Sequence, residues 1–408
     1  MTQLERAQPV IVCLASYFKG GEFLRQASEL GARIFLVTRE LLRDESWPHD
    51  AIDEILFVPD HAGPEEYLRT VSNLAQRVVL DRIVALEEFD VITAGHIREH
   101  LALPGMTGSY ARLFRDKLLM RRAARAAGVA VPDFALPLNP DTAREYAERV
   151  PGPWVLKPRS DVSAIGIKKI ENADQLWDRL NELNSREVFK ETPGFFVLER
   201  FVPGQVFHVD SLVSGSKVVF ALANQYGRPP MDVAHGGGVF VSHNLKVGSA
   251  ESRSLYQLNR KIIKTLGLID GVAHAEFIRS DEDGALYFLE IAARVGGAYL
   301  AETFEAASGL SLWREWAKIE LSAGTDAYSV NPGRREYAGI ALSLARQEHP
   351  DTSLYDDPEI VFRVNKPFHV GLVVRSPDHG RVVDLLHQYQ SRFAEDFCAV
   401  APPRERVE

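Results

Sequence analysis

Residues 274–294 read HAEFIRSDEDGALYFLEIAAR, and this pattern predicts a β-hairpin. Residues 272–279 and 285–291 are strand-like, whereas residues 280–284 form an Asp/Gly-rich run that is typical of a turn. The predicted strands each carry one glutamate, so the register of the hairpin decides whether the two carboxylates meet.

The register that follows from the turn brings the two glutamates together. With Arg279 opposite Ala285, Glu290 faces His274 and lies diagonal to Glu276 on the same face. A slip of one residue would put the carboxylates on opposite faces. Two carboxylates held close together repel unless a cation or a shared proton lies between them, and oxygen-only ligands suit Mg²⁺. The alternative is a surface hairpin with two solvated glutamates.

The composition is that of a multidomain globular protein. A length of 408 residues predicts two or three domains, and 46% apolar with 25% charged residues is ordinary for such a chain. The net charge of −9 argues against a nucleic-acid partner. No apolar run is long enough to span a membrane, and the N-terminus lacks the apolar core of a signal peptide. Cys13 and Cys398 suggest no disulfide framework, so a reducing cytoplasm is the expected compartment.

The first hundred residues alternate between strand and helix signals. Buried strands are expected at residues 10–14, 34–37, 55–58 and 82–86, with a helix over residues 22–30. Short buried strands separated by helices indicate a parallel, doubly wound α/β sheet. The loop at residues 17–21, YFKGG, follows the first strand, where such folds often bind ligands, but it is not a GxGxxG dinucleotide fingerprint.

The remaining chain predicts α+β units. A basic helix is expected over residues 109–127, ending before Gly128, with most of its arginines on a solvated face. Further strands are expected at residues 154–157, 166–170, 195–202, 337–343 and 369–374, and a helix over residues 380–393. We expect three domains: an N-terminal α/β domain at residues 1–106, a catalytic region at 107–330 and a small C-terminal α+β unit at 331–408.

Two lysines are candidate phosphate contacts. Lys157 ends an apolar strand and is followed by a loop of small residues, whose backbone amides can close over phosphates. Its ammonium would supply a compact counter-charge. Lys117 on the basic helix could be a second contact. The alternatives are an ordinary hairpin loop and a surface lysine.

Residues 196–204, FVLERFVPG, predict a strand that breaks at Pro203-Gly204. Where a strand stops pairing, its backbone groups become free to bind a flat heterocycle. A neighbouring carboxylate could accept the amino hydrogens of adenine. A plain strand followed by a turn is the competing interpretation.

Residues 231–239, MDVAHGGGV, suggest a flexible loop because three glycines follow one another. His235, Gly236 and Gly237 are therefore candidate substrate contacts; the alternative is a mobile surface loop. His208, His243 and His274 lack the spacing of zinc ligands and are expected to be structural.

The order of these motifs resembles the ATP-grasp superfamily. RDK, VLKP with SAIGI, LERFVPG, HAEF and LEIAAR follow one another over roughly residues 107–320, and the N-terminal region resembles the pre-grasp domain of that family. The resemblance implies a fold that clamps ATP between two α+β subdomains. It implies these roles: Lys117, Lys157, Ser163 and Gly166 at the phosphates; Glu199, Arg200 and Val202 at the adenine; Glu276 and Glu290 on Mg²⁺ (or Mn²⁺); Arg294 and Lys157 at the transferred phosphoryl group.

The resemblance also implies an activity. The AAR ending is similar to the branch that contains L-amino acid ligases, so a small-molecule carboxylate and an amine are the expected substrates. They would be joined through an acyl phosphate with release of ADP and phosphate. Ala292 stands where many relatives have a metal-binding Asn, and Val206 falls near the usual acidic ribose contact. Another ATP-grasp reaction, such as hydroxyl phosphorylation or carboxylation, and an inactive nucleotide-binding protein stay open. So does a homodimer, which many relatives form.

Overall fold

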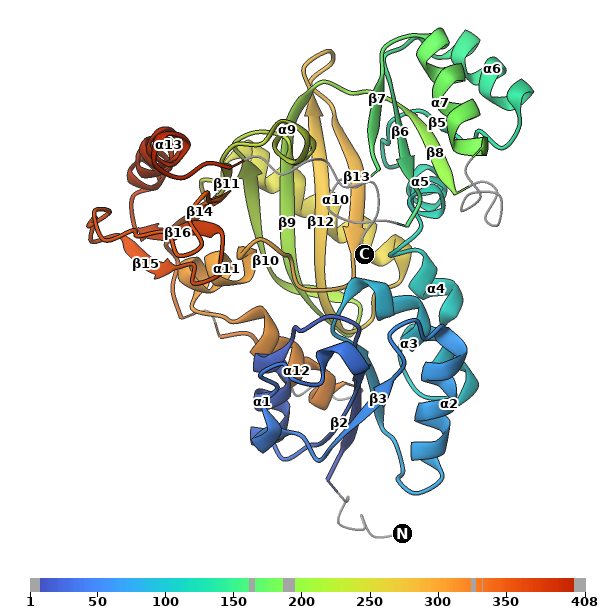
Figure 1. The fold of residues 1–408 in the computed structure, drawn as a ribbon, viewed down its shortest axis with the longest axis vertical. Coiled ribbons are helices and arrows are strands. Elements are labelled where there is room, and N and C mark those ends of the chain that lie inside the picture. The colour runs from blue at the N-terminus through green and yellow to red at the C-terminus, as the bar shows by residue number, and fades with distance from the viewer. Residues whose placement is uncertain (1–7, 161–165, 186–194, 324–327, 332, 400–408) are drawn as a thin grey trace.

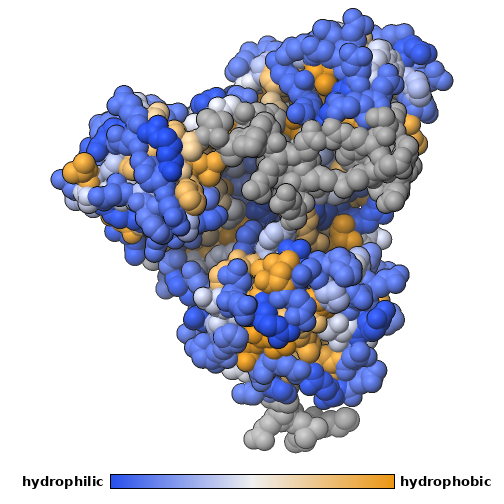
Figure 2. Space-filling view, viewed as in Figure 1, coloured by the Kyte–Doolittle hydropathy of each residue, from blue (hydrophilic) through white to orange (hydrophobic). Residues whose placement is uncertain are grey.

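The computed structural model describes residues 8–160, 166–185, 195–323, 328–331 and 333–399. An N-terminal lobe and a second lobe lie beside a central sheet, whose C-terminal strands extend away to one side (Figure 1). Hydrophilic side chains cover most of the outer surface seen in Figure 2, apart from an apolar area on the lobe that contains the N-terminus. No helix in the described ranges is both long enough and apolar enough to cross a membrane.

The N-terminal lobe is a four-stranded parallel sheet in the order β3-β2-β1-β4, which confirms the predicted doubly wound fold. Its strands are β1 (Val10–Ala15), β2 (Arg33–Arg39), β3 (Glu54–Val58) and β4 (Arg82–Ala85). Its helices are α1 (Gly21–Glu29), α2 (Pro64–Ala75) and α3 (Val91–His100), with short η1 (Glu40–Leu42), η2 (His49–Ala51) and η3 (Glu88–Asp90). Because β1 lies between β2 and β4, the loops after β1 and β4 flank the crevice where this fold binds ligands.

A helix from far along the chain covers one face of this parallel sheet. Helix α12 (Leu312–Ser322) packs against α1, with the rings of Phe23 and Trp316 5.3 Å apart, and both belong to one buried core. Helices α2 and α3 bury their apolar residues against the other face. The N-terminal lobe is thereby joined to the central sheet through a shared core.

The predicted basic helix is two helices, so that prediction was wrong in its extent. Helix α4 (Gly108–Arg112) ends before a turn, and α5 (Lys117–Ala126) begins after Asp116, whose carboxylate accepts the backbone N–H of Leu118 at 3.0 Å. An aspartate at this capping position favours a new helix start. The break leaves Lys117 at the first turn of α5.

A second lobe, here called the flap lobe, is a four-stranded antiparallel sheet in the order β5-β8-β6-β7. Its elements are β5 (Phe134–Ala135), α6 (Pro140–Arg149), β6 (Trp154–Pro158), β7 (Lys168–Ile170), α7 (Ala173–Ser185) and β8 (Phe196–Arg200). The two helices pack on one face around Trp154 and Leu156, which form a separate small core.

The central sheet has eight antiparallel strands in the order β13-β12-β9-β10-β11-β14-β16-β15. The strands are β9 (Gly204–Ser214), β10 (Lys217–Tyr226), β11 (Phe240–Asn244), β12 (Gly271–Ser280), β13 (Leu286–Ala292), β14 (Tyr337–Leu344), β15 (Ile360–Arg363) and β16 (His369–Ser376). Helices α9 (Pro230–Gly236), α10 (Ala250–Leu266), α11 (Leu300–Ser308) and α13 (His379–Asp396) flank it. The C-terminal strands thus continue the same sheet, and the domain boundaries given above stay a prediction.

Candidate active site

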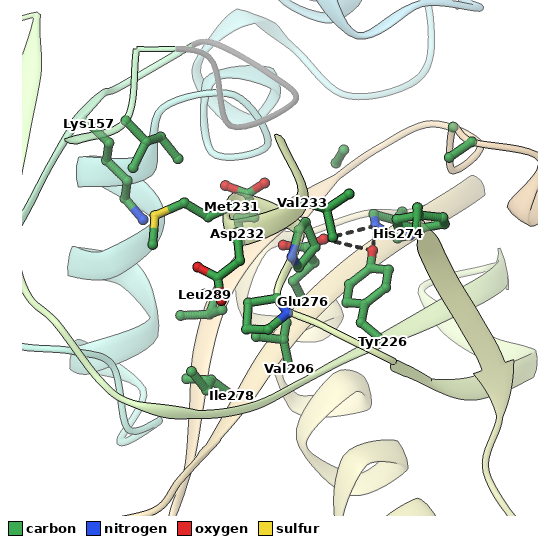
Figure 3. A pocket seen from close by; sticks show the side chains of 18 of the residues that line it. Lys157, Val206, Tyr226, Met231, Asp232, Val233, His274, Glu276, Ile278 and Leu289 are labelled. Carbon is green, nitrogen blue, oxygen red and sulfur yellow. Dashed lines mark hydrogen bonds and ion pairs between the residues drawn. The ribbon is translucent and has the colours of Figure 1, made fainter. Parts of the chain in front are cut away.

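The lobes enclose a cavity of about 1060 Å³. Its lining includes Lys19 and Glu88 from the N-terminal lobe, Lys157 from the flap lobe, and Glu276 and Glu290 from the central sheet. Figure 3 shows Lys157 reaching into this space from one side, while Glu276, Tyr226 and His274 meet on the other. Common ligand pockets measure roughly 300–1,000 Å³, so this cavity has room for a nucleotide and a second small molecule.

The predicted hairpin is β12 and β13, and its two glutamates lie directly opposite each other. The predicted register was wrong, because Arg279 opposes Leu286 rather than Ala285. A β-bulge next to Glu276 then adds one residue on β13. The offset at the turn and the bulge together shift the pairing by two residues, and a shift of two keeps each side chain on its face. The predicted shared face is therefore confirmed, but Glu290 opposes Glu276 rather than His274. Directly opposed residues have Cβ atoms about 4.5–5.5 Å apart, close enough to share a cation.

Lys117 balances the charge of Glu290. Its Nζ lies 3.2 Å from Glu290 Oε2, and the lysine is buried. Burial alone would raise the pKa of Glu290, but Lys117 and Lys157 lower it to about 2. The carboxylate is therefore ionised at neutral pH and available as a ligand.

Lys157 belongs to a buried three-residue ion cluster. Its Nζ lies 2.8 Å from Glu199 Oε2, and Arg121 Nε lies 2.9 Å from Glu199 Oε1. Burial would raise the pKa of Glu199, but Arg121 and Lys157 hold it below its usual value. Because both of its oxygens face cations, Glu199 anchors Lys157 beside the cavity. A contact between Glu199 and adenine stays a prediction.

The predicted adenine hinge lies at the cavity wall. Arg200 and Val202 both line the cavity, and Val202 is buried. Arg200 Nη1 lies 2.6 Å from Glu282 Oε2, so the hinge is tied to the turn of the β12–β13 hairpin. The adenine contacts of Arg200 and Val202 stay predictions.

The predicted phosphate loop is only partly visible. Ser163 lies outside the described residues. Gly166 has a φ of +70°, which favours glycine, and the next residue, Ile167, lines the cavity. Gly166 lies two residues before β7, and its contact with phosphate stays a prediction.

Arg294 lines the cavity and is held by the N-terminal lobe. Its Nε and Nη2 donate to Glu88 Oε2 at 2.9 and 2.7 Å. Arg115 Nη1 lies 2.5 Å from Glu88 Oε1, and Arg115 also donates to the carbonyl of Ser160, two residues after β6. Burial would raise the pKa of Glu88, but Arg294 and Arg115 hold it below its usual value. Glu88 therefore connects Arg294 to the N-terminal lobe directly and to the flap lobe through Arg115.

The predicted flexible loop at residues 231–239 was partly wrong, because its first part forms helix α9 with Pro230 at the first turn. Met231, Asp232 and Val233 line the cavity, as do Gly237 and Gly238. Gly236 is exposed, and the side chain of His235 lies outside what the structure describes. The proposed substrate contacts of this segment stay predictions.

Several residues of the site carried no signal of their own in the sequence. Arg115, Arg121 and Tyr226 look like ordinary helix and strand residues until the fold buries them. Glu88 follows β4 at the carboxyl edge of the parallel sheet. The rule that ligands bind at this edge could have identified Glu88 as a candidate.

Comparisons with known proteins agree with this geometry. Residues 150–302 match the ATP-grasp domain family, and residues 24–105 match the ATP-grasp N-terminal domain family. The L-arginine-specific L-amino acid ligase of Bacillus subtilis is 23% identical over 253 residues, which are 62% of this chain and 60% of that protein. The chain therefore matches less than two thirds of that relative.

Two solved structures share the fold over nearly the whole chain. The L-amino acid ligase from Bacillus licheniformis superposes with a TM-score of 0.73 at 15% identity, covering 97% of this chain and 100% of that one. The biotin carboxylase domain of the Hydrogenobacter thermophilus 2-oxoglutarate carboxylase, solved with MgADP, gives a TM-score of 0.68 at 17% identity, covering 93% and 88%. Two family matches in the expected order, and one fold throughout, show that this chain belongs to the ATP-grasp superfamily.

Proposed function

We propose that this protein is an ATP-dependent carboxylate–amine ligase acting on small molecules, with amino acids as the expected substrates. The observation that carries the proposal is the pair Glu276 and Glu290, directly opposed on one face of a cavity into which Lys117, Lys157 and Arg294 also reach. The L-amino acid ligases among the similar proteins support the choice of substrates.

The donor atoms of the pair fit a divalent metal. Two carboxylates form an all-oxygen set, and magnesium commonly uses one or two carboxylates together with phosphate oxygens and water. Glu276 and Glu290 would hold the ion, which when bound would offset the charge of the ATP phosphates. Ala292 also lines the cavity but offers no side-chain oxygen, so water or phosphate would complete the coordination.

The chain's own residues would align the reactants and balance their charge. Lys157, fixed by Glu199, and Lys117, at the start of α5, would lie against the phosphates. The substrate carboxylate would attack the terminal phosphorus to give an acyl phosphate and ADP. The amine would then attack the acyl carbon, and the carbon–oxygen bond to phosphate would break. Arg294 has a planar group with five N–H donors, which suits the phosphoryl oxygens in both steps.

The wall beside the metal ligands favours an apolar substrate side chain. Tyr226, whose hydroxyl donates to Glu276 at 2.9 Å, has its ring 5.5 Å from that of Phe240. Phe240 opposes Leu342 in the β11–β14 ladder, and Leu300 packs against the same cluster. All four line the cavity. We therefore infer that one of the joined molecules places an apolar group on this wall.

The test is a screen of amino-acid pairs with ATP and Mg²⁺, in which ADP release and product mass are measured. Hydroxylamine is then added to trap an acyl phosphate as a hydroxamate. We expect ADP release with an amide product, and Glu290→Gln should abolish it while remaining folded. Glu251→Gln is the matched control, because Glu251 pairs with Arg279 on the same hairpin but does not line the cavity.

The screen also separates the alternatives. A kinase would release ADP with a phosphorylated hydroxyl product and no hydroxamate. A nucleotide-binding protein without activity would bind ATP and release no ADP with any pair, and the missing oxygen at Ala292 is the feature that favours it. Normal Mg²⁺-dependent ADP release by Glu290→Gln would refute the metal assignment.

A further inference from the structure

A row of buried polar side chains crosses the central sheet behind the proposed metal ligand. Glu276 on β12 opposes His208 on β9, His208 opposes Asn224 on β10, and Asn224 opposes Asn244 on β11. In the neighbouring row, His274 opposes Asp210. Side chains two residues apart on a strand share a face, so both rows lie on the same face of the sheet.

The contacts in these rows form a continuous network that starts at Glu276. Its Oε1 accepts the Tyr226 hydroxyl at 2.9 Å and lies 3.5 Å from His274 Nε2. His274 Nδ1 lies 2.8 Å from Asp210 Oδ1, and His208 Nδ1 lies 2.8 Å from Asp210 Oδ2. Dashed lines in Figure 3 mark the contacts among Glu276, Tyr226 and His274.

The network continues from Asp210 to the C-terminal strands. Asn224 Nδ2 donates to Asp210 Oδ2 at 3.3 Å, and Asn244 Nδ2 donates to Asn224 Oδ1 at 2.5 Å. Asn244 Oδ1 in turn accepts the backbone N–H of Ala338 on β14 at 2.8 Å. The carboxylate of Asp210 is therefore held by partners on both neighbouring strands, β12 and β10.

The donor atoms of His208, Asp210 and His274 lie within 4.8 Å of one another, as they would in a metal site. The Nδ1 atom of each histidine, however, already lies at hydrogen-bond distance from its own oxygen of Asp210. Asp210 is 1% exposed and does not line the cavity, whereas His274 does. The three residues are therefore better described as a hydrogen-bonded support than as a second metal centre.

Burial of this polar network does not by itself favour folding. An ionised carboxylate inside a sheet costs several kcal/mol of desolvation unless it is paired, and apolar residues of similar volume often replace such networks without loss of stability. Metal ligands, in contrast, are commonly oriented by a second layer of hydrogen-bonded carboxylates and histidines. The network has this form, because Asp210 reaches Glu276 only through His274.

We propose that Asp210 is a positioning residue that, through His274 and together with Tyr226, holds the Glu276 carboxylate in the orientation that binds a divalent cation. The proposal rests on the proposed metal role of Glu276. It adds two residues, Asp210 and Tyr226, whose effect should be on metal affinity rather than on nucleotide affinity.

The experiment compares Asp210→Asn and Tyr226→Phe with the wild-type protein. ADP affinity is measured by titration calorimetry with and without Mg²⁺, and the Mg²⁺ concentration for half-maximal ADP binding is determined. Loss of an outer-layer partner typically weakens metal affinity about 10- to 100-fold, so we expect a shift of about tenfold in both variants with unchanged ADP affinity in EDTA. Tyr256→Phe is the matched control, because that partly buried hydroxyl accepts the backbone N–H of Ala223 on β10, the strand of Tyr226, but does not line the cavity.

The outcomes separate this proposal from the proposed function. If Glu276→Gln loses the Mg²⁺ effect while folded Asp210→Asn and Tyr226→Phe keep wild-type Mg²⁺ dependence, the positioning role is wrong and the metal site stands. If Glu276→Gln itself keeps the wild-type dependence, the metal assignment is wrong and this proposal falls with it. Should Asp210→Asn not fold, Tyr226→Phe decides, because it removes one hydroxyl and keeps the ring. An equal shift in Tyr256→Phe would also overturn the proposal.

Discussion

Glu88 and Arg294 are 206 residues apart in the chain, yet Arg294 Nη2 lies 2.7 Å from Glu88 Oε2. Glu88 stands at the carboxyl edge of the parallel sheet, and Arg294 follows β13, the second strand of the β12–β13 hairpin. The ion pair therefore fixes how the N-terminal lobe meets the central sheet, at the point where the transferred phosphoryl group is expected.

Glu88→Gln should lower turnover more than it weakens ATP binding. The substitution keeps the shape of the side chain but leaves Arg115 and Arg294 without their counter-charge. A misplaced catalytic group costs roughly 10²-fold in rate, and breaking a buried pair costs about 3–5 kcal/mol of stability. We expect a large fall in kcat, a nearly unchanged KM for ATP and a lower Tm, measured by steady-state kinetics and thermal unfolding.

Glu54→Gln serves as the control for this variant. Glu54 pairs with Arg77 at 2.7 Å in the same lobe, but both side chains are exposed. A surface pair contributes about 0–1 kcal/mol, so both kcat and Tm should stay close to wild type. A Glu88→Gln variant that behaved like this control would contradict the proposed role of the pair.

Lys157→Met should weaken nucleotide binding. The variant removes a buried cation that lines the cavity and leaves Glu199 with Arg121 alone. A hydrogen bond to a charged group contributes about 1.5–3 kcal/mol, which corresponds to roughly 10- to 100-fold in ADP affinity. Titration calorimetry measures this change. Lys318→Met, which breaks a pair with Glu315 on α12, should leave ADP affinity unchanged.

Local patterns predicted much of the fold. The strands of the parallel sheet appear where short apolar runs stand between helix signals. The shared face of the two glutamates depends instead on the register of β12 against β13, which is not a local property. The bulge on β13 was not predictable, since one extra residue leaves no mark in the composition. The bulge shifts the register by one residue, and together with the one-residue offset at the Arg279–Leu286 pair it places Glu290 opposite Glu276.

Long-range pairing accounts for the other misses. Arg121 has the same sequence context as its solvated neighbours on the basic helix, and its burial depends on Glu199, 78 residues away. The predicted C-terminal strands were correct in position, but their place in the central sheet depends on the pairing of β11 with β14. Periodicity identifies neither Glu199 as the partner of Arg121 nor β11 as the partner of β14, because tertiary contacts set both pairings.

Asp90→Asn should change how stability depends on pH. Burial raises the pKa of Asp90 to about 6, although Ser16 lowers it through a backbone N–H at 2.7 Å and its hydroxyl. The pKa in the unfolded chain is about 3.9, so the folded state binds the proton more tightly. The stability that Asp90 contributes is therefore present below about pH 4 and lost as the pH rises through about 6.

Asparagine carries no such charge, so the variant should lose less stability over this range. We expect the free energy of unfolding of Asp90→Asn, relative to wild type, to rise by up to about 3 kcal/mol between pH 4 and 7. Chemical denaturation at each pH measures it. Asp384→Asn, at an exposed position, is the control. Its difference from wild type in the free energy of unfolding should not change with pH. A flat difference for Asp90→Asn would show that its carboxyl titrates normally.

Leu342→Asp should change which substrate the cavity accepts. Leu342 lies on the apolar wall opposite Phe240, and a carboxylate there would be desolvated by an apolar side chain but paired by a cationic one. One methylene group in an apolar pocket changes specificity by about 10- to 200-fold. We therefore expect kcat/KM for leucine-like substrates to fall at least about tenfold, and kcat/KM for arginine or lysine to rise relative to it. Leu354→Asp carries the same change at a side chain that is 81% exposed, and it should leave the preference of the wild-type protein intact. If the wild-type protein already prefers cationic amino acids, the apolar wall does not contact the substrate side chain, although the ligase activity would stand.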